Sequence, residues 1–171
     1  MSKRVRKWRT QNGLAPHSPG LRMRLPDGRP IPVLHGFSRH IIPRPEDWPA
    51  TAIVTGYWFL NQAENWNPPR ALIEFLSRGE PPVYFGFGSI FGRDPKRVTQ
   101  IILEAIRRTG VRAILARGWG GLEPNDSAQS ESVMLIEAAP HSWLFPQVSA
   151  VVHHGGCGTT AAGLLAGKPS I

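Results

Sequence analysis

The sequence predicts an α/β fold in which a Rossmann-like parallel sheet carries helices on its faces, preceded by an extended proline-rich basic arm. From Arg70 onward, short apolar runs alternate with helical patterns, which is typical of a parallel sheet with crossover helices. More than half of the 17 prolines precede Arg70, and proline lacks the amide donor that regular structure needs. We therefore expect a linker or arm over residues 1–69 and a domain over residues 70–171.

The arm concentrates the positive charge of the chain. Residues 1–44 hold ten of the 20 Lys and Arg residues against a single acid, Asp27, whereas the remainder is close to neutral. Such a segment suits a neighbouring acidic domain, an anionic membrane surface or a nucleic acid. The charge pattern leaves these partners open, although no specific nucleic acid is expected.

The elements of the domain are predicted from apolar periodicity and from glycine and proline positions. In helix 94–108, we expect the apolar residues Val98, Ile101, Ile102, Ala105 and Ile106 to share the buried face. In chain order the prediction gives helix 70–77, strand 82–88, helix 94–108, strand 113–116, a polar loop 118–130, strand 133–137, helix 141–148, strand 150–153, helix 158–166 and the opening of a further strand at 169–171.

The single cysteine, Cys157, excludes a disulfide framework and a cysteine-rich zinc site. The sequence has no apolar run of the length that spans a bilayer. We therefore expect a cytoplasmic protein whose membrane contact, where there is any, is peripheral. Because the chain stops inside a predicted strand, we also expect it to be a fragment.

The strongest chemical signal is the stretch His153-His-Gly-Gly-Cys-Gly-Thr-Thr160, which lies between a strand and a helix. Its glycines let backbone amides approach an anion, and the helix N-terminus adds the positive end of a dipole. The ring N–H of His154 and the hydroxyl of Thr159 suit phosphate oxygens. The pattern favours a diphosphate site, and the alternative is a plain turn in which a threonine caps the helix.

Residues 141–170 resemble the donor-binding signature of the family 1 glycosyltransferases, with the sterol 3-beta-glucosyltransferases and the bacterial glycopeptide enzymes as the nearest relatives. Residues 44–49, 56–59 and 81–89 are also similar to motifs of that family. The resemblance implies the C-terminal half, here incomplete, of a GT-B fold, in which two Rossmann-like domains face a cleft. It also implies a UDP-sugar donor, no cofactor and no bound metal.

The resemblance also assigns roles to single residues. His154 is the expected phosphate-binding residue, and His153 is expected to be a core histidine. Trp143 is expected to anchor its helix in the core, and Cys157 to be a small packed side chain. The other expected donor-binding residues are Gly156, Gly158 and Thr159 around the diphosphate, Ala138 and His141 at the nucleobase, and Ser89 near the sugar or diphosphate, with Gly88 and Trp119 as cleft walls.

The implied activity is transfer of a hexosyl group, expected to be glucose from UDP-glucose, to a sterol or another lipophilic hydroxyl acceptor. In the family the base and the acceptor pocket belong to an N-terminal domain, so we expect no catalytic residue within these 171 residues and no turnover by them alone. Two alternatives stay open: a non-catalytic nucleotide or nucleotide-sugar-binding module, and an interaction protein that uses the basic arm.

Overall fold

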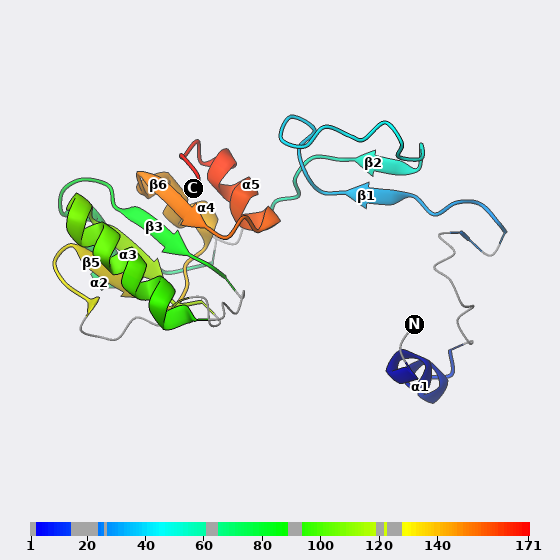
Figure 1. The fold of residues 1–171 in the computed structure, drawn as a ribbon, viewed down its shortest axis with the longest axis horizontal. Helices are drawn as coiled ribbons and strands as arrows, with labels where there is room; N and C mark the ends of the chain where they lie inside the picture. The colour runs from blue at the N-terminus through cyan, green and yellow to red at the C-terminus, as the bar shows by residue number, and fades with distance from the viewer. Residues whose placement is uncertain are drawn as a thin grey trace. The chain divides into compact units, whose positions relative to one another are not determined.

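The computed structural model describes residues 3–14, 24–25, 27–60, 65–88, 94–118, 122 and 128–171. The chain divides into two compact units, Met1–Gly56 and Tyr57–Ile171, whose elements are labelled in Figure 1. The predicted boundary between arm and domain, after residue 69, stays a prediction, because compactness alone does not fix where a domain begins.

The described part of the first unit holds a helix and a pair of strands. Helix α1 spans Lys3–Gln11, and strands β1 (Val33–His35) and β2 (Ala52–Val54) pair in parallel. The helix differs from the extended arm that the prolines predicted. Residues 3–11 contain no proline, and the long unbranched side chains of Lys and Arg favour a helix locally.

Arginine and aromatic contacts organise the connection between β1 and β2. The guanidinium of Arg44 donates to the carbonyl oxygens of Trp48 at 2.6 Å and Pro49 at 2.9 Å. The ring of Trp48 lies 4.2 Å from that of His35, centroid to centroid. Among the described residues of this unit only Ala52 is buried, so the unit has almost no apolar core.

The second unit is built on a parallel sheet. Its strands are β3 (Val83–Gly86), β4 (Ala113–Ala116), β5 (Val133–Ile136) and β6 (Ala150–His153), in the spatial order β5-β4-β3-β6. A parallel bridge joins Ser170 to Val151, where the opening of a further strand was predicted. The predicted α/β fold with a parallel sheet is confirmed.

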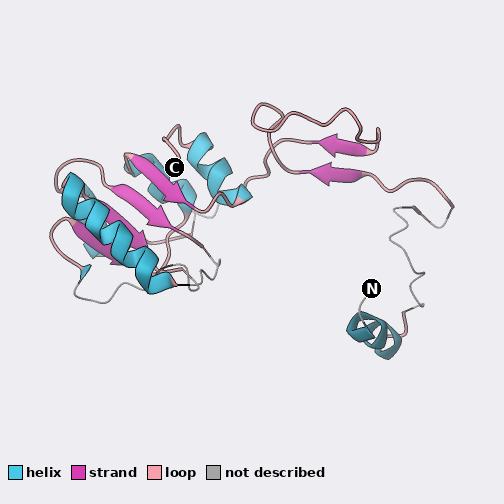
Figure 2. Ribbon diagram, viewed as in Figure 1, coloured by secondary structure: helices cyan, strands magenta, loops and turns pink. Residues whose placement is uncertain are grey.

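Helices connect and cover these strands (Figure 2). They are α2 (Arg70–Ser77), α3 (Pro95–Thr109), α4 (His141–Leu144), which continues into the 3-10 helix η2 (Phe145–Gln147), and α5 (Cys157–Leu165). Helix α3 begins where Asp94 accepts a hydrogen bond from the Arg97 amide at 2.9 Å, and it ends at Gly110 in the left-handed conformation.

Two apolar layers lie on the two faces of the sheet. Successive strand residues point to opposite faces, so Tyr84 and Ile114 belong to one layer and Phe85 and Leu115 to the other. Helix α3 packs on the layer of Phe85 and Leu115, while α2, α4 and α5 pack on the opposite layer. The sheet is therefore covered on both faces, as parallel sheets generally are.

The predicted buried face of α3 needs a correction. The buried residues are Thr99, Ile102 and Ile106, whereas Ile101 is 60% exposed and Ala105 is also exposed. The helical period of 3.6 residues rotates each residue by about 100° from the one before it, so Ile101 and Ile102 cannot both point at the sheet. Packing selects the face that carries Ile102.

Among the described residues, no helix combines the length and the apolar character that crossing a bilayer requires.

Candidate functional site

The order of the strands marks one edge of the sheet as a place for a ligand. From β3 the chain proceeds to β4 and β5 on one side, and then returns to place β6 on the other side of β3. In open α/β sheets, ligands bind at the carboxyl ends of the strands where the order reverses in this way. Here these ends are Gly86 and His153, which are register partners.

His154, the first residue after β6, lies in a narrow slot between two glycines. A Cβ built on Gly88 would lie 3.0 Å from His154 Cε1, and a Cβ built on Gly156 would lie 2.5 Å from His154 Nε2. The absence of a side chain at both glycines therefore leaves room for the imidazole. His154 Nδ1 is buried and has no hydrogen-bond partner among the described residues. Burying a polar atom unpaired costs about 1–3 kcal/mol, which a ligand or a water can relieve.

His153 has a different environment from its neighbour. Its Nδ1 accepts a hydrogen bond from the amide of Gly155 at 3.0 Å, which closes the turn after β6. Burial lowers the pKa of His153, and the adjacent His154 lowers it further. His153 is thus a half-buried histidine with a backbone partner, and it belongs to neither apolar layer. The expected hydrogen-bonded histidine is present, but its expected place in the core is wrong.

The N-terminus of α5 faces the same edge of the sheet. Gly156 is the residue that precedes the helix, and none of the described side chains caps the helix there. The alternative of a capping threonine is therefore not what the structure has. The first turn of a helix has amides without partners inside the helix, and they include those of Gly158 and Thr159. A Cβ built on Gly158 would meet nothing within 4 Å. The space beside this turn is open.

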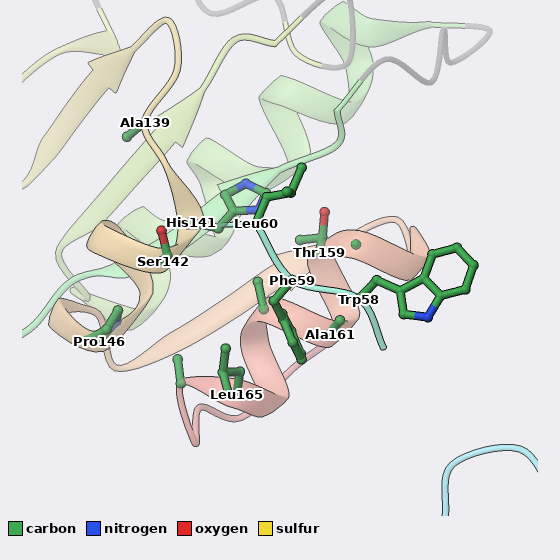
Figure 3. A pocket seen from close by; sticks show the side chains of 13 residues that line it. Trp58, Phe59, Leu60, Ala139, His141, Ser142, Pro146, Thr159, Ala161 and Leu165 are labelled. Atoms are coloured by element: carbon green, nitrogen blue, oxygen red, sulfur yellow. The ribbon is translucent and has the colours of Figure 1, made fainter. Parts of the chain in front are cut away.

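A cavity of about 610 Å³ adjoins this turn (Figure 3). Three segments line it: residues 58–60, α4 with the residues that flank it, and α5. Of the predicted donor-binding residues, His141, Gly158 and Thr159 line this cavity, whereas His154, Gly156 and Gly88 pack against one another at the strand ends. The remaining lining residues are Trp58, Phe59, Leu60, Ala139, Ser142, Pro146, Ala161, Ala162, Leu165 and Ala166.

His141 connects the cavity to the apolar layer beneath it. Its ring stacks on Phe145 with a centroid distance of 4.3 Å and meets Tyr84 edge to face at 5.9 Å. Burial lowers the pKa of His141, and the charge of His153 lowers it further. The imidazole is consequently neutral at pH 7 and offers one donor and one acceptor.

The other predicted site residues have varied placements. Ala138 is exposed and does not line the cavity, whereas its neighbour Ala139 does. Ser89 and Trp119 lie outside the described residues. The binding roles assigned to all of these residues stay predictions.

Two further expectations have different outcomes. Trp143 packs against the core with its ring centroid 4.9 Å from that of Trp66, as expected of an anchor. Cys157 is exposed, so the expectation of a packed side chain is wrong. Its position in the first turn of α5 leaves its side chain outside the apolar layers.

Sequence reasoning missed several residues of this site, among them Ser142 and Phe59, which line the cavity. Gly118 begins a segment that was expected beside the cleft, and it approaches the backbone of Gly88 at the strand ends. Ser142 directly follows a predicted site residue, and Phe59 lies in an aromatic run, but neither signal identifies a cavity by itself. Across the described part of the chain, no three His, Cys, Asp or Glu side chains gather in a metal-binding group.

Comparisons with known proteins agree on one kind of relative. The chain is 49% identical over 140 residues to a sterol 3-beta-glucosyltransferase of Arabidopsis thaliana, and 44% identical over 151 residues to one of Neosartorya fischeri. Each alignment covers 82% of this chain, which spans only 23% and 11% of the lengths of the two relatives. The resemblance that the sequence motifs indicated is thereby confirmed.

A solved structure shows the same fold. The crystal structure described as the glycotransferase of kitacinnamycin matches 98% of this chain with a TM-score of 0.63, at 19% sequence identity, over 41% of its own length. No family model matches the chain.

Proposed function

Because the chain is homologous to part of the sterol 3-beta-glucosyltransferases, we propose that its second unit binds the UDP-sugar donor of such an enzyme. The whole enzyme would transfer glucose from UDP-glucose to the hydroxyl group of a sterol or a similar lipophilic alcohol. The observation that carries this proposal is the meeting of the His154 ring with the uncapped first turn of α5, at the edge where the strand order reverses.

The strand ends support a diphosphate at this position. His154 has a buried ring nitrogen without a partner among the described residues, and the N-terminus of α5 attracts negative charge. Alanine at position 158 would meet no atom within 4 Å, and would favour the helix by about 1 kcal/mol over glycine. Packing therefore does not require glycine there, whereas close approach of a phosphate to the amides does.

The cavity supports a nucleoside beside the diphosphate. Its volume of about 610 Å³ is within the range of small-molecule sites, and its wall is mostly apolar with a few polar groups. The neutral ring of His141 offers a donor and an acceptor, and the hydroxyl of Ser142 lies on the same helix. An uncharged base with adjacent donor and acceptor groups, such as uracil, complements this pair.

The proposed chemistry is stabilisation of the leaving group. As the bond between the sugar and the diphosphate breaks, negative charge develops on the phosphate oxygen that leaves. An imidazole N–H of His154 and the amides of Gly158 and Thr159 would donate hydrogen bonds to the diphosphate. The acceptor hydroxyl needs a base to take its proton, and we place that base in a part of the enzyme outside these 171 residues.

Helix α1 supports a second, independent contact with an anionic lipid surface. Five of its nine residues are Lys or Arg and none is acidic. Trp8 is 57% exposed and Val5 is 41% exposed, and they are three positions apart on one helical face. Cationic helices with tryptophan on one face bind the interface of anionic membranes, which face the cytoplasm. Peripheral attachment there would bring the enzyme to lipophilic acceptors.

Titration calorimetry with UDP tests the donor site. We expect UDP to bind, and His154→Ala to weaken binding roughly 10- to 100-fold, because hydrogen bonds to charged groups contribute about 1.5–3 kcal/mol. His40→Ala, at an exposed histidine of the first unit, is the matched control and should bind as the wild type does. Equal affinity in His154→Ala and the wild type would contradict the proposal, as would no UDP binding at all.

Two further assays test the activity of the chain and the role of α1. With radiolabelled UDP-glucose and a sterol, we expect no transfer by the 171-residue chain above the level of His154→Ala. Transfer above that level would place the base within the chain.

Co-sedimentation with phosphatidylcholine vesicles, with and without phosphatidylserine, tests membrane binding by α1. Replacing Lys7 and Arg9 by glutamine should weaken the binding that depends on phosphatidylserine.

A further inference from the structure

Three neighbouring strand ends form a row behind the phosphate site. Gly88 lies two residues after β3, Gly118 lies two residues after β4, and His154 lies one residue after β6. The register pairs Gly86 with Ala116 on one side and with His153 on the other. Gly118, Gly88 and His154 therefore follow one another across the carboxyl edge of the sheet.

The contacts along this row are close. A Cβ built on Gly118 would lie 2.7 Å from the carbonyl oxygen of Gly88. A Cβ built on Gly88 would lie 3.0 Å from His154 Cε1, and a Cβ built on Gly156 would lie 3.1 Å from the same atom. A Cβ does not fit 2.7 Å from a backbone oxygen, so a side chain at position 118 would force the backbone of Gly88, which is exposed, to shift. A change at Gly118 thus reaches the imidazole through the backbone of Gly88.

We propose that Gly118 is a positioning residue for His154, acting through Gly88. This inference rests on the proposed role of His154 as a hydrogen-bond donor to the diphosphate, because that role requires a fixed ring. A hydrogen bond weakens steeply as its angle falls, so a ring displaced or rotated in its slot would meet the diphosphate with poorer geometry. Gly118 itself touches neither the sugar nor the phosphates in this scheme.

Backbone strain needs a separate control, because Gly118 has a positive φ of 57°. Any L-residue is strained there, whatever surrounds it. Gly110, at the end of α3, has a φ of 67°, and a Cβ built on it would meet nothing within 4 Å. Gly110→Ala therefore reproduces the strain without the contact, and the difference between the two variants isolates the contact.

The experiment compares Gly118→Ala with Gly110→Ala by two readouts. The first is UDP affinity by calorimetry, where we expect about a 10-fold loss for Gly118→Ala and less than about a 2-fold loss for Gly110→Ala, since the former impairs one charge-assisted hydrogen bond. The second is the Cε1–H signal of His154 in carbon–proton NMR spectra, which should shift in Gly118→Ala and stay in place in Gly110→Ala. Folding of both variants is checked by circular dichroism.

The outcomes separate this inference from the proposed function. Failure of the wild type to bind UDP would overturn the proposed function, while the His154 signal would still decide whether Gly118 positions the ring. Equal UDP affinities and unshifted His154 signals in both variants would overturn the positioning role. Should Gly118→Ala fail to fold, two other measurements decide. One is the nuclear Overhauser effect between His154 Hε1 and Gly88 Hα in the wild type, whose absence overturns the role. The other is UDP binding by Gly88→Ala, which should be weakened similarly.

Discussion

The two units of the chain obtain their structure from different interactions. In the second unit, two apolar layers enclose a parallel sheet, and residues such as Leu115 and Phe145 are wholly buried. In the described part of the first unit only Ala52 is buried, and its strand pair is accompanied by Arg44 bonded to backbone carbonyls and by ring contacts. Regular strands occur in both units, but among the described residues only the second unit has an apolar core.

This difference indicates which unit can hold a site with fixed geometry. A slot such as that of His154 requires neighbours that do not yield, and close-packed interiors provide them. In the first unit, the hydrogen bonds from Arg44 to backbone carbonyl oxygens fix the course of the chain, but they resist displacement less than a packed core does. We therefore expect substitutions to affect the two units separately and by different amounts.

The largest effect is expected from the core. Leu115→Ala, at a fully buried position of β4, should lower the free energy of unfolding by about 2–5 kcal/mol, because it removes buried methyl groups and leaves a cavity. Leu34→Ala, at a 53% exposed position of β1, should change it by less than about 0.5 kcal/mol. Urea denaturation followed by circular dichroism measures both. Similar losses for the two variants would remove the distinction between the units.

A smaller effect is expected from Arg44. Arg44→Ala removes the hydrogen bonds to the carbonyl oxygens of Trp48 and Pro49, so the first unit should lose roughly 2 kcal/mol of stability. Amide hydrogen exchange of β2 should accelerate, while exchange of β4 should not change. Arg44→Lys should recover only part of the effect, since an ammonium group lacks the planar fork of guanidinium. Faster exchange in β4 would mean that the two units are coupled.

Gly158→Ala should separate stability from binding within the second unit. Alanine meets no atom there and favours the helix, so the free energy of unfolding should rise by up to about 1 kcal/mol. The added methyl group would enter the space proposed for the diphosphate, so UDP affinity should fall about 10-fold, which corresponds to about 1.4 kcal/mol. Thermal melts with and without UDP measure both quantities. Stabilisation with unchanged UDP affinity would show that the ligand lies elsewhere.

The smallest effect is a loss of stability of the second unit at acid pH. The pKa values of His141 and His153 are lowered in the folded state, chiefly by burial, from an ordinary value of 6.5. Above that value both rings are neutral in either state. As the pH falls below it, the unfolded chain takes up protons first, and the stability decreases until the folded pKa values are passed.

His141→Gln tests that pH dependence. The variant should reduce the decline of unfolding free energy between pH 7 and pH 5. Urea titrations at each pH provide the measurement. A decline of the same size in His141→Gln would assign the effect to other groups.

The sequence predicted the second unit well because its signals are local. Apolar runs bounded by glycine and proline gave the four strands, and Asp94 marked the start of α3. The buried face of α3 was harder to predict from the sequence, because Thr99 rather than Ile101 faces the sheet, and only packing distinguishes them. In the first unit, proline content concealed helix α1, because composition averages over segments of different character.

The candidate site was predicted as far as its residues belong to one motif. His154, Gly156, Gly158 and Thr159 are consecutive or nearly so, and a strand followed by a glycine-rich helix start predicts an anion site. Gly118 is more than thirty residues away and meets this group only because β4 and β6 flank β3. Contacts of this kind depend on the strand order, which a local sequence motif does not reveal.

We place the diphosphate of a nucleotide sugar between the turn after β6 and the first turn of α5. A crystal structure of the chain with UDP would test this placement. We predict phosphate oxygens within hydrogen-bonding distance of the His154 ring and of the Gly158 and Thr159 amides, with the base in the cavity beside His141. UDP bound at any other place on the chain, with the His154 slot unchanged and unoccupied, would contradict the claim.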